Sequence, residues 1–393
     1  MKRNILIACL ILTSAASAEF LLPNYVSRFV ARLGTDLALV ETKPTHEITF
    51  PENSFLANEF LFTFTPIKTA KTKRIAGLIK VEDERRYIAV QQGDLKFAGY
   101  DLGDFLVKNK IDIQAQTQPI LKQLLTVQGT NFALLGLVSK GCVFAMLVNL
   151  NKMLTADRYP CVDNSGEDVN FNNLGGGYVV QGNILYMSLG LTSSVTRGKV
   201  SFLAQDESSP YGKVLKYAIN KNASGIDLSE RTIFTKGHRN LQGMAIINGH
   251  IVAVEHGAKG GDEINILEEN KNYGWPLYSA GSKYNNDDLV AFAPEMVGIT
   301  NPLFTFIPAI APSDISPCPS IIKRRYDGMD CMLISGLRAK SFYIVLGDLD
   351  KNRIVSLEKI EVEARIREVF IDDDRLYLAP DLATLLVVDI EAF

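Results

Sequence analysis

Two short segments of the sequence concentrate side chains that bind anions. Arg239, Asn240 and Gln242 lie within four consecutive positions, so in an extended or turning loop they can present several hydrogen-bond donors to one small anion. Arg365 and Arg367 alternate as in a strand and therefore point the same way. Arginine meets carboxylates through a planar fork of N–H groups. These residue types and spacings predict a site for a ligand that carries carboxylates.

The sequence around these residues predicts short β-strands joined by tight turns. Asn248-Gly249 lies between two apolar runs and is a strong hairpin signal, because both residues tolerate positive φ in a type I′ turn. Similar paired runs lie at residues 80–90, 135–144, 179–186 and 370–377. The hairpins recur at irregular intervals of about 40 to 65 residues, with the last interval about twice as long, which is typical of a β-propeller with loop insertions. The predicted fold class is therefore all-β.

The N-terminus predicts an exported protein. Lys2 and Arg3 precede an apolar run at residues 5–12 and the small residues 16–18, which is the order of a secretory signal peptide cleaved after Ala18. Residues 19–75 fit the strand pattern poorly, and we expect an N-terminal extension or a divergent first blade there, with the propeller over 76–393. The apolar run is too short to span a bilayer, and no later segment has eighteen uninterrupted apolar residues. We expect a periplasmic or secreted protein without a membrane span.

The charge balance argues against nucleic acid as a partner. Removing Lys2 and Arg3 with the signal takes the 41 basic residues to 39, against 44 acidic ones. Nucleic-acid binding needs a basic surface that neutralises phosphates. A chain with an acidic excess does not meet that requirement.

Four of the five cysteines remain after the signal is removed, and they form two near pairs. Cys142 lies near Cys161, and Cys318 lies near Cys331. In an oxidising compartment an even number at short separations favours disulfides, although four cysteines permit three connectivities. Free buried thiols are one alternative. A zinc site is another, and it is disfavoured because no pair has Cys-x-x-Cys spacing and no histidine is near.

Three ordered segments resemble the signature of the glucose/sorbosone dehydrogenase family. Residues 237–245 read GHRNLQGMA, residues 256–265 read HGAKGGDEIN, and residues 272–276 read NYGWP. The resemblance implies a six-bladed β-propeller of four-stranded antiparallel blades. It also implies the cofactors PQQ and calcium, a sugar oxidised at its anomeric carbon, and an electron acceptor.

The resemblance further implies that PQQ is bound by side chains from several loops. Those side chains are Arg239, Asn240, Gln242, Arg338, Arg365, Arg367 and Asn131. Arg338 stands where relatives often carry lysine. Asn131 opens the run 131–135, which is similar to the family's Gln-Gly-Gly-Leu-Leu segment and would place Asn131 at a PQQ-contacting glutamine.

For calcium, the resemblance implies the main-chain carbonyls of Gly257 and Ala258 as ligands. A hard cation suits oxygen ligands, and backbone oxygens tolerate replacement of a side chain. Asp262 and Glu263 are candidate ligands of a structural calcium ion. Their alternative role is to stabilise the following turn by hydrogen bonds.

The catalytic part of the family pattern is missing. Relatives carry a histidine just before a Gly-Gly-Arg-like segment, and this chain has Asn173 at that position and Gly177 at the arginine position. Asparagine cannot accept a proton at physiological pH. Leu191 replaces the aspartate that lies close to the base in relatives, and His256 is only a weak substitute for that base.

These departures leave three hypotheses. The first is an active PQQ-dependent sugar dehydrogenase. The second is a catalytically impaired propeller that binds PQQ, a sugar or a protein partner. The third is an interaction propeller that binds no PQQ.

Overall fold

The computed structural model describes most of the chain after residue 53. The described residues are 54–67, 75–81, 86–111, 119–139, 142–163, 169–190, 192–193, 198–223, 225–283, 289–291, 298–381 and 385–393. The chain divides into two compact units, residues 1–50 and residues 51–393, and every described residue belongs to the second. The predicted signal peptide, residues 1–18, lies outside the described residues.

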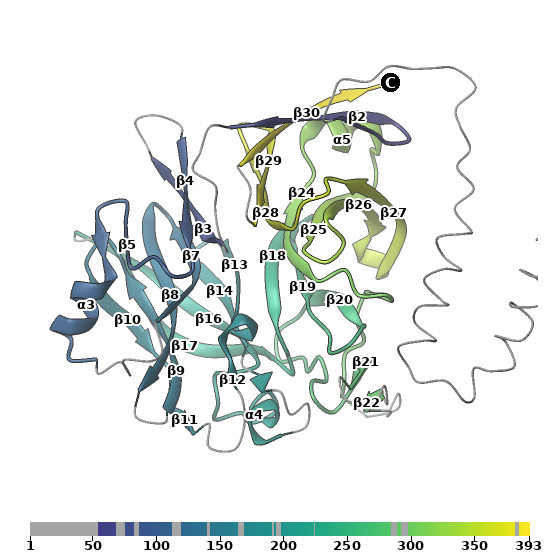
Figure 1. The fold of residues 1–393 in the computed structure, drawn as a ribbon. Helices are drawn as coiled ribbons and strands as arrows, with labels where there is room; N and C mark the ends of the chain where they lie inside the picture. Colours follow the sequence, from purple (N-terminus) through teal and green to yellow (C-terminus); the bar gives the residue numbers. More distant parts are fainter. Residues whose placement is uncertain are drawn as a thin grey trace, which may run out of the picture. The chain divides into compact units, whose positions relative to one another are not determined.

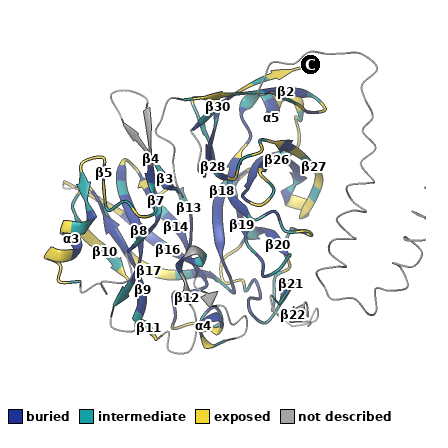
Figure 2. Ribbon diagram, viewed as in Figure 1, coloured by how far each residue is buried: buried dark blue, intermediate teal, exposed yellow. Residues whose placement is uncertain are grey.

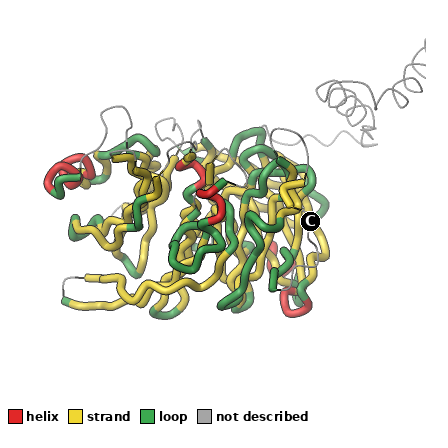
Figure 3. The backbone as a smooth tube through the Cα atoms, turned by 90° about the horizontal axis from the view of Figure 1, so that it is seen from below, coloured by secondary structure: helices red, strands yellow, loops and turns green. Residues whose placement is uncertain are grey.

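Antiparallel sheets make up most of the regular secondary structure of the described chain. Strands run throughout Figure 3, and the helices are short. The first two sheets contain β3 (Ile75–Val81) and β4 (Arg86–Gln91), then β7 (Ile120–Val127), β8 (Thr130–Ser139), β9 (Cys142–Asn149) and β10 (Leu154–Arg158), with β11 (Val162–Asp163) paired to β9. The third and fourth contain β13 (Gly175–Gln181), β14 (Ile184–Leu189), β16 (Lys213–Asn222) and β17 (Gly225–Lys236), then β18 (Leu241–Ile247), β19 (His250–Glu255), β20 (Asp262–Leu267) and β23 (Phe304–Phe306).

The last two large sheets are formed by the C-terminal part of the chain together with its first described strands. They contain β24 (Pro312–Pro317), β25 (Asp330–Gly336), β26 (Ser341–Asp348) and β27 (Arg353–Glu361), then β28 (Ile366–Asp372), β29 (Arg375–Pro380), β30 (Leu386–Ala392), β2 (Phe60–Pro66) and β1 (Ser54–Leu56). Minor ladders pair β5 (Lys96–Phe97) with β6 (Tyr100–Asp101), β12 (Val169–Asn170) with β15 (Thr192–Ser193), and β21 (Ser279–Ser282) with β22 (Leu289–Ala291). The helices are α3 (Leu102–Lys108), α4 (Lys199–Phe202), α5 (Ser320–Arg325), η1 (Phe171–Asn173) and η2 (Leu349–Lys351).

The large sheets follow one another in chain order around a common centre (Figure 1). The two-stranded β3–β4 sheet and the five larger sheets each contribute an edge strand to the lining of one central cavity of about 500 Å³, and those strands are β3, β7, β13, β18, β24 and β28. The main-chain N–H of Ile75, in the first sheet, donates to Asp381 Oδ1, beside the last sheet, at 3.4 Å. This arrangement is that of a β-propeller, and the sheet count is consistent with six blades.

The predicted hairpins form where the turn residues placed them. Asn248 and Gly249 both have positive φ, at 47° and 83°, and join β18 to β19 as a type I′ turn requires. Strands β28 and β29 are joined in the same way through Asp373 and Asp374. These local turns bring each inner strand back against its neighbour.

The last sheet includes strands from both ends of the described chain. Strand β2 pairs with β30 along its whole length, from Phe60 opposite Ala392 to Pro66 opposite Leu386. Strands β1 and β2, which lie in the range where the sequence predicts an N-terminal extension or a divergent first blade, are therefore part of the last sheet. Hydrogen bonds between these two strands complete the last sheet.

Apolar side chains fill the spaces between successive sheets. Phe132, Leu147, Leu185 and Met187, for example, are fully buried in one cluster between the second and third sheets. Burying a side chain of this size stabilises the fold by about 1.5–3 kcal/mol. Figure 2 shows the inner strand β18 largely buried and the outer strand β27 largely exposed. In the described residues, no helix is long and apolar enough to cross a membrane.

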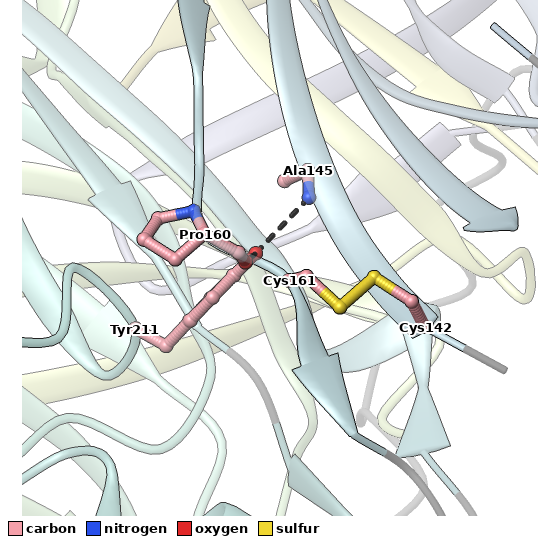
Figure 4. The surroundings of a disulfide bond; sticks show 5 residues. All are labelled: Cys142, Ala145, Pro160, Cys161 and Tyr211. Carbon is pink, nitrogen blue, oxygen red and sulfur yellow. Dashed lines mark hydrogen bonds between the residues drawn. A yellow bond between two sulfur atoms is a disulfide. The ribbon is translucent and has the colours of Figure 1, made fainter. Parts of the chain in front are cut away.

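Both predicted disulfides are present. Cys142 pairs with Cys161, and Cys318 pairs with Cys331. Beside the first bond, the Tyr211 hydroxyl accepts a hydrogen bond from Ala145 N at 3.1 Å and donates to the Pro160 carbonyl at 2.8 Å (Figure 4). The disulfide and the tyrosine thus attach the same segment, next to Cys161, to strand β9.

Candidate functional site

The signature segments meet at the start of β18. Trp275 N donates to Gly237 O at 2.8 Å, and Tyr273 N donates to Lys236 O at 2.8 Å. Gly237 has φ of 79°, and a Cβ there would lie 2.2 Å from Asn272 Oδ1, so only glycine allows this approach. The segments 237–245 and 272–276 are therefore held together by their main chains.

Arg239 lies over the indole of Trp275. Its guanidinium carbon is 5.4 Å from the ring centre, and its Nη1 donates to the His256 carbonyl at 3.3 Å. Its main-chain N–H donates to Glu255 Oε1 at 2.6 Å. Two buried donors here, Arg239 Nε and Trp275 Nε1, have no hydrogen-bond partner among the described residues.

Those two unpaired N–H groups indicate that the site is built to receive acceptor atoms. A buried polar group left without a partner costs about 1–3 kcal/mol. Arg239 and Trp275 are only 8% and 4% exposed, so solvent satisfies them poorly. PQQ carries carboxylates and quinone oxygens, and this donor set fits such a group.

A chain of polar side chains runs from β7 to the segment before β13. Lys122 Nζ donates to Gln242 Oε1 at 3.1 Å, and Gln242 Nε2 donates to Asn240 Oδ1 at 2.5 Å. Asn240 Nδ2 then donates to Asn173 Oδ1 at 3.3 Å. Three predicted residues, Asn173, Asn240 and Gln242, are thus brought together with one that was not predicted.

Lys122 was missed, and Asn131 does not join this cluster. Asn131 lies near the turn between β7 and β8, where its side chain accepts from Thr126 Oγ1 at 2.8 Å and donates to Tyr100 Oη at 3.2 Å. The run 121–125, Leu-Lys-Gln-Leu-Leu, ends in the same Leu-Leu pair as the run 131–135 and is the one that reaches Gln242. The Leu-Leu pair occurs in both runs, so the sequence alone does not single out Lys122.

Arg365 and Arg367 converge on Asp381, which the sequence did not single out. Arg367 holds this carboxylate through two bonds, from Nη2 at 2.7 Å and from Nε at 3.3 Å. Arg365 Nε lies 3.8 Å from the same carboxylate, and its Nη1 donates to the Leu337 carbonyl at 3.5 Å. The Arg365 side chain is 43% exposed and the Arg367 side chain 13%. Arg338, next to Leu337, is exposed.

His256 is a poor candidate for the missing base. Its Nε2 donates to the Pro312 carbonyl at 2.8 Å. Burial, together with the positive charges of Arg239 and Lys122, lowers the pKa of His256 to about 3. The imidazole is therefore neutral at physiological pH and binds a proton only weakly. Leu191, at the second departure from the family pattern, lies outside the described residues.

Asp262 stabilises two loops. Its Oδ1 accepts from Gly257 N at 3.0 Å, and its Oδ2 accepts from Ala311 N at 2.7 Å. Burial raises the pKa of this carboxyl. Both oxygens therefore hold main-chain groups, and these belong to the loops at Gly257 and Ala311 rather than to the turn after Asp262.

Glu263 lies in a different environment, next to an unpaired amide oxygen. Its Oε2 accepts from Asn265 Nδ2 at 3.1 Å, and Asn265 Oδ1 is buried without a partner among the described residues. Burial and the neighbouring Glu255 raise the pKa of Glu263 to about 8. Within the described part of the chain, no three His, Cys, Asp or Glu side chains are grouped as metal ligands.

Comparison with solved structures bears out the fold. The apo form of the soluble aldose sugar dehydrogenase from Escherichia coli superposes with a TM-score of 0.64 at 20% identity, over 84% of this chain and 100% of that one. The PQQ-bound aldose sugar dehydrogenase from Streptomyces coelicolor gives 0.54 at 17% identity, over 84% and 98%. At these identities the likeness shows a shared fold.

Sequence comparison finds relatives over shorter stretches. An uncharacterized protein of Synechocystis is 33% identical over 139 residues, 35% of this chain and 33% of its own length. The aldose sugar dehydrogenase YliI of Escherichia coli is 43% identical over 75 residues, 18% of this chain and 20% of its own. Quinoprotein glucose dehydrogenase B of Acinetobacter calcoaceticus is 37% identical over 87 residues, 21% and 18%. The chain thus matches about a third or less of the length of each of these relatives.

The family model for glucose/sorbosone dehydrogenases matches residues 164–386, more than half of the chain. That range contains Arg239, Asn240, Gln242 and the Arg365–Arg367 pair. The chain belongs to the glucose/sorbosone dehydrogenase family.

Proposed function

We propose that this protein binds PQQ at the site formed by Arg239, Asn240 and Gln242, and that it is a PQQ-dependent aldose sugar dehydrogenase-like protein. The observation that carries the proposal is the pair of unpaired donors, Arg239 Nε and Trp275 Nε1. Arg365 and Arg338 add exposed cations for the carboxylates of the cofactor. When bound, PQQ supplies the electron sink for oxidation of a sugar at its anomeric carbon, and an electron acceptor must then reoxidise it.

Each residue has a separate part in this proposal. Arg239 orients the cofactor, because its guanidinium is fixed between Trp275 and the His256 carbonyl. Asp381 holds Arg367 in place, and Arg365 remains the more accessible of the two arginines. Asn173 and His256 do not supply a strong proton acceptor. These two residues favour the second candidate function, a catalytically impaired propeller that binds PQQ, a sugar or a protein partner.

Calcium is part of the proposal through two groups of oxygen atoms. The first is the main-chain carbonyls of Gly257 and Ala258. The second is Glu263 together with the unpaired Asn265 Oδ1, since carboxylate and amide oxygens suit a hard cation. Asp262 is the less suitable ligand, because both of its oxygens accept main-chain hydrogen bonds.

The single tryptophan of the chain makes the proposal directly testable. Trp275 lies against Arg239, so its fluorescence reports on this site alone. We expect saturable quenching on titration with PQQ in the presence of calcium, and loss of saturation in Arg239→Ala. Arg375→Ala is the matched control, because Arg375 is a surface arginine 57% exposed and paired with Asp389. The absence of saturable quenching at micromolar PQQ in the unsubstituted protein would rule out cofactor binding.

Turnover needs a second assay. Dye-linked oxidation of a panel of aldoses by the PQQ-loaded protein separates an active dehydrogenase from the impaired propeller. Robust turnover would exclude the impaired propeller. The two disulfides support a periplasmic or secreted location, because such bonds persist in oxidising compartments.

A further inference from the structure

The residue before Arg239 is a histidine whose ring takes part in a buried chain of hydrogen bonds. His238 Nε2 lies 2.8 Å from Thr235 Oγ1, and His238 Nδ1 lies 2.8 Å from Glu255 Oε2. The imidazole stacks on the Tyr273 ring, with the ring centres 4.8 Å apart. Thr235, His238 and Glu255 are all buried, so solvent does not compete for these bonds. The stacking holds the plane of the imidazole, and each ring nitrogen has one partner.

Glu255 connects this chain to Arg239. Its Oε1 accepts a hydrogen bond from Arg239 N at 2.6 Å, while its Oε2 faces His238. The next residue, His256, accepts from Arg239 Nη1 through its carbonyl at 3.3 Å. Arg239 is therefore held at its main chain by residue 255 and at its guanidinium by residue 256. These contacts fix the arginine relative to the segment 256–258.

The direction of the hydrogen bonds follows from Glu255. A carboxylate only accepts hydrogen bonds, so His238 must carry a hydrogen on Nδ1. In a neutral imidazole Nε2 is then an acceptor, and it receives the Thr235 hydroxyl. Glu255 thus selects the tautomer of His238, and both of its oxygens have a donor.

We infer that Glu255 is a positioning residue of the proposed PQQ site. Its carboxylate, oriented by His238, holds Arg239 over Trp275 with the unpaired Nε in place for an acceptor of the ligand. Groups that bind a ligand must stay within about 0.5 Å of the productive geometry, which buried supporting hydrogen bonds achieve. The inference rests on the proposed function for the identity of the ligand, whereas the positioning itself is measurable without PQQ.

Two substitutions at Glu255 separate its hydrogen bonds from its charge, because both remove the charge. In Glu255→Gln the amide oxygen still accepts from Arg239 N, and the NH₂ group donates to His238 Nδ1. Glu255→Met keeps neither bond. We expect Glu255→Gln to bind PQQ within about threefold of the unsubstituted protein, and Glu255→Met to bind it about tenfold or more weakly.

The tautomer of His238 is a signature that a merely space-filling role would not move. Nitrogen NMR of protein labelled at its four histidines measures it, with His238→Gln to assign the signal. We expect a hydrogen on Nδ1 in the unsubstituted protein. In Glu255→Gln the hydrogen should move to Nε2, because the amide donor needs an acceptor at Nδ1 and the Thr235 hydroxyl can turn to accept.

Trp275 gives a second readout in the absence of PQQ. This single tryptophan is 4% exposed and lies under the guanidinium of Arg239. Acrylamide quenching of its fluorescence should increase in Glu255→Met and stay unchanged in Glu255→Gln. Tyr159→Phe is the matched control for lost stability, because it removes a buried hydroxyl bonded to Tyr217 in the cluster between the second and third sheets. It should change neither quenching nor PQQ affinity.

Unchanged quenching and PQQ affinity in Glu255→Met would overturn the inference, and so would equal losses in Glu255→Met and Glu255→Gln. A His238 hydrogen on Nε2 alone in the unsubstituted protein would also overturn it, and this measurement decides if Glu255→Met does not fold. If the tautomer and the quenching change as expected but no protein binds PQQ, the cofactor proposal fails while the positioning role stands. If PQQ binds equally to all variants, the reverse holds.

Discussion

Asn173 Oδ1 accepts a hydrogen bond from Asn240 Nδ2 at 3.3 Å, so the residue at the predicted position of the family's base is tied to a residue of the proposed PQQ site. The two residues lie 67 positions apart and meet because η1 ends where β18 begins to enter the centre. Gly190 makes this approach possible, since a Cβ there would lie 2.5 Å from the Asn173 carbonyl.

Restoring the family pattern should restore proton transfer. We expect Asn173→His together with Leu191→Asp to raise dye-linked aldose oxidation by at least about 10²-fold, the usual contribution of a positioned base. PQQ binding by the variant, followed by Trp275 quenching, is the control. Normal cofactor binding without a gain in rate would mean that the missing base is not the main obstacle.

The two arginines on Asp381 should differ in their effect on stability. Arg367→Met leaves a carboxylate that is only 5% exposed without its bidentate partner, and we expect a loss of about 3–5 kcal/mol in the free energy of unfolding. Arg365→Met should cost less than about 1 kcal/mol, because the Arg365 side chain is 43% exposed, yet it should weaken PQQ binding. Urea unfolding and PQQ titration of both variants check this, and equal destabilisation would contradict it.

Glu368 should make stability depend on pH. This carboxyl lines the central cavity beside Gln123, Asp314, Tyr178 and Arg367, and burial raises its pKa to about 7. A carboxyl whose folded-state pKa is raised contributes stability below its unfolded pKa, near 4.5, and this contribution is lost as pH rises through 7. The Glu368→Gln variant lacks this titrating carboxyl, so it lacks this pH-dependent contribution to stability.

The comparison is therefore between the two proteins at pH 5 and pH 8. We expect the Glu368→Gln variant to gain stability relative to the unsubstituted protein as pH rises. The difference in the free energy of unfolding, variant minus unsubstituted protein, should be about 1–3 kcal/mol larger at pH 8 than at pH 5. Thermal and urea unfolding at both pH values measure it. A difference that does not change with pH would show that Glu368 titrates as an ordinary carboxyl.

The segment beside the first disulfide should lose stability by two separable routes. The double variant Cys142→Ser, Cys161→Ser should lower the free energy of unfolding by about 2–4 kcal/mol, because the disulfide is lost. Tyr211→Phe should lower it by about 1–3 kcal/mol, because Ala145 N and the Pro160 carbonyl then lack their partner. Urea unfolding of each variant gives these values. Because both attach the same segment, the combined variant should lose less than the sum, and full additivity would show that the two attachments act independently.

Local sequence features predicted the turns, and they proposed several residues of the candidate site. Asn248-Gly249 fixes its hairpin through backbone preference alone. Arg365 lies just before β28 and Arg367 within it, and both approach Asp381. Lys122 and Asp381 enter the site only through long-range packing, since their partners are 120 and 14 residues away in other strands or loops. No local pattern shows whether the run 121–125 or the run 131–135 supplies the side chain that contacts Gln242. That depends on which run lies in an inner strand.

The pairing of β2 with β30 has a consequence for biosynthesis. The final sheet lacks its partner strand until the last residues have been made, so an incomplete chain presents an unpaired strand edge and an open ring. The hydrogen bonds between β2 and β30 therefore protect this edge only after both strands have been synthesised.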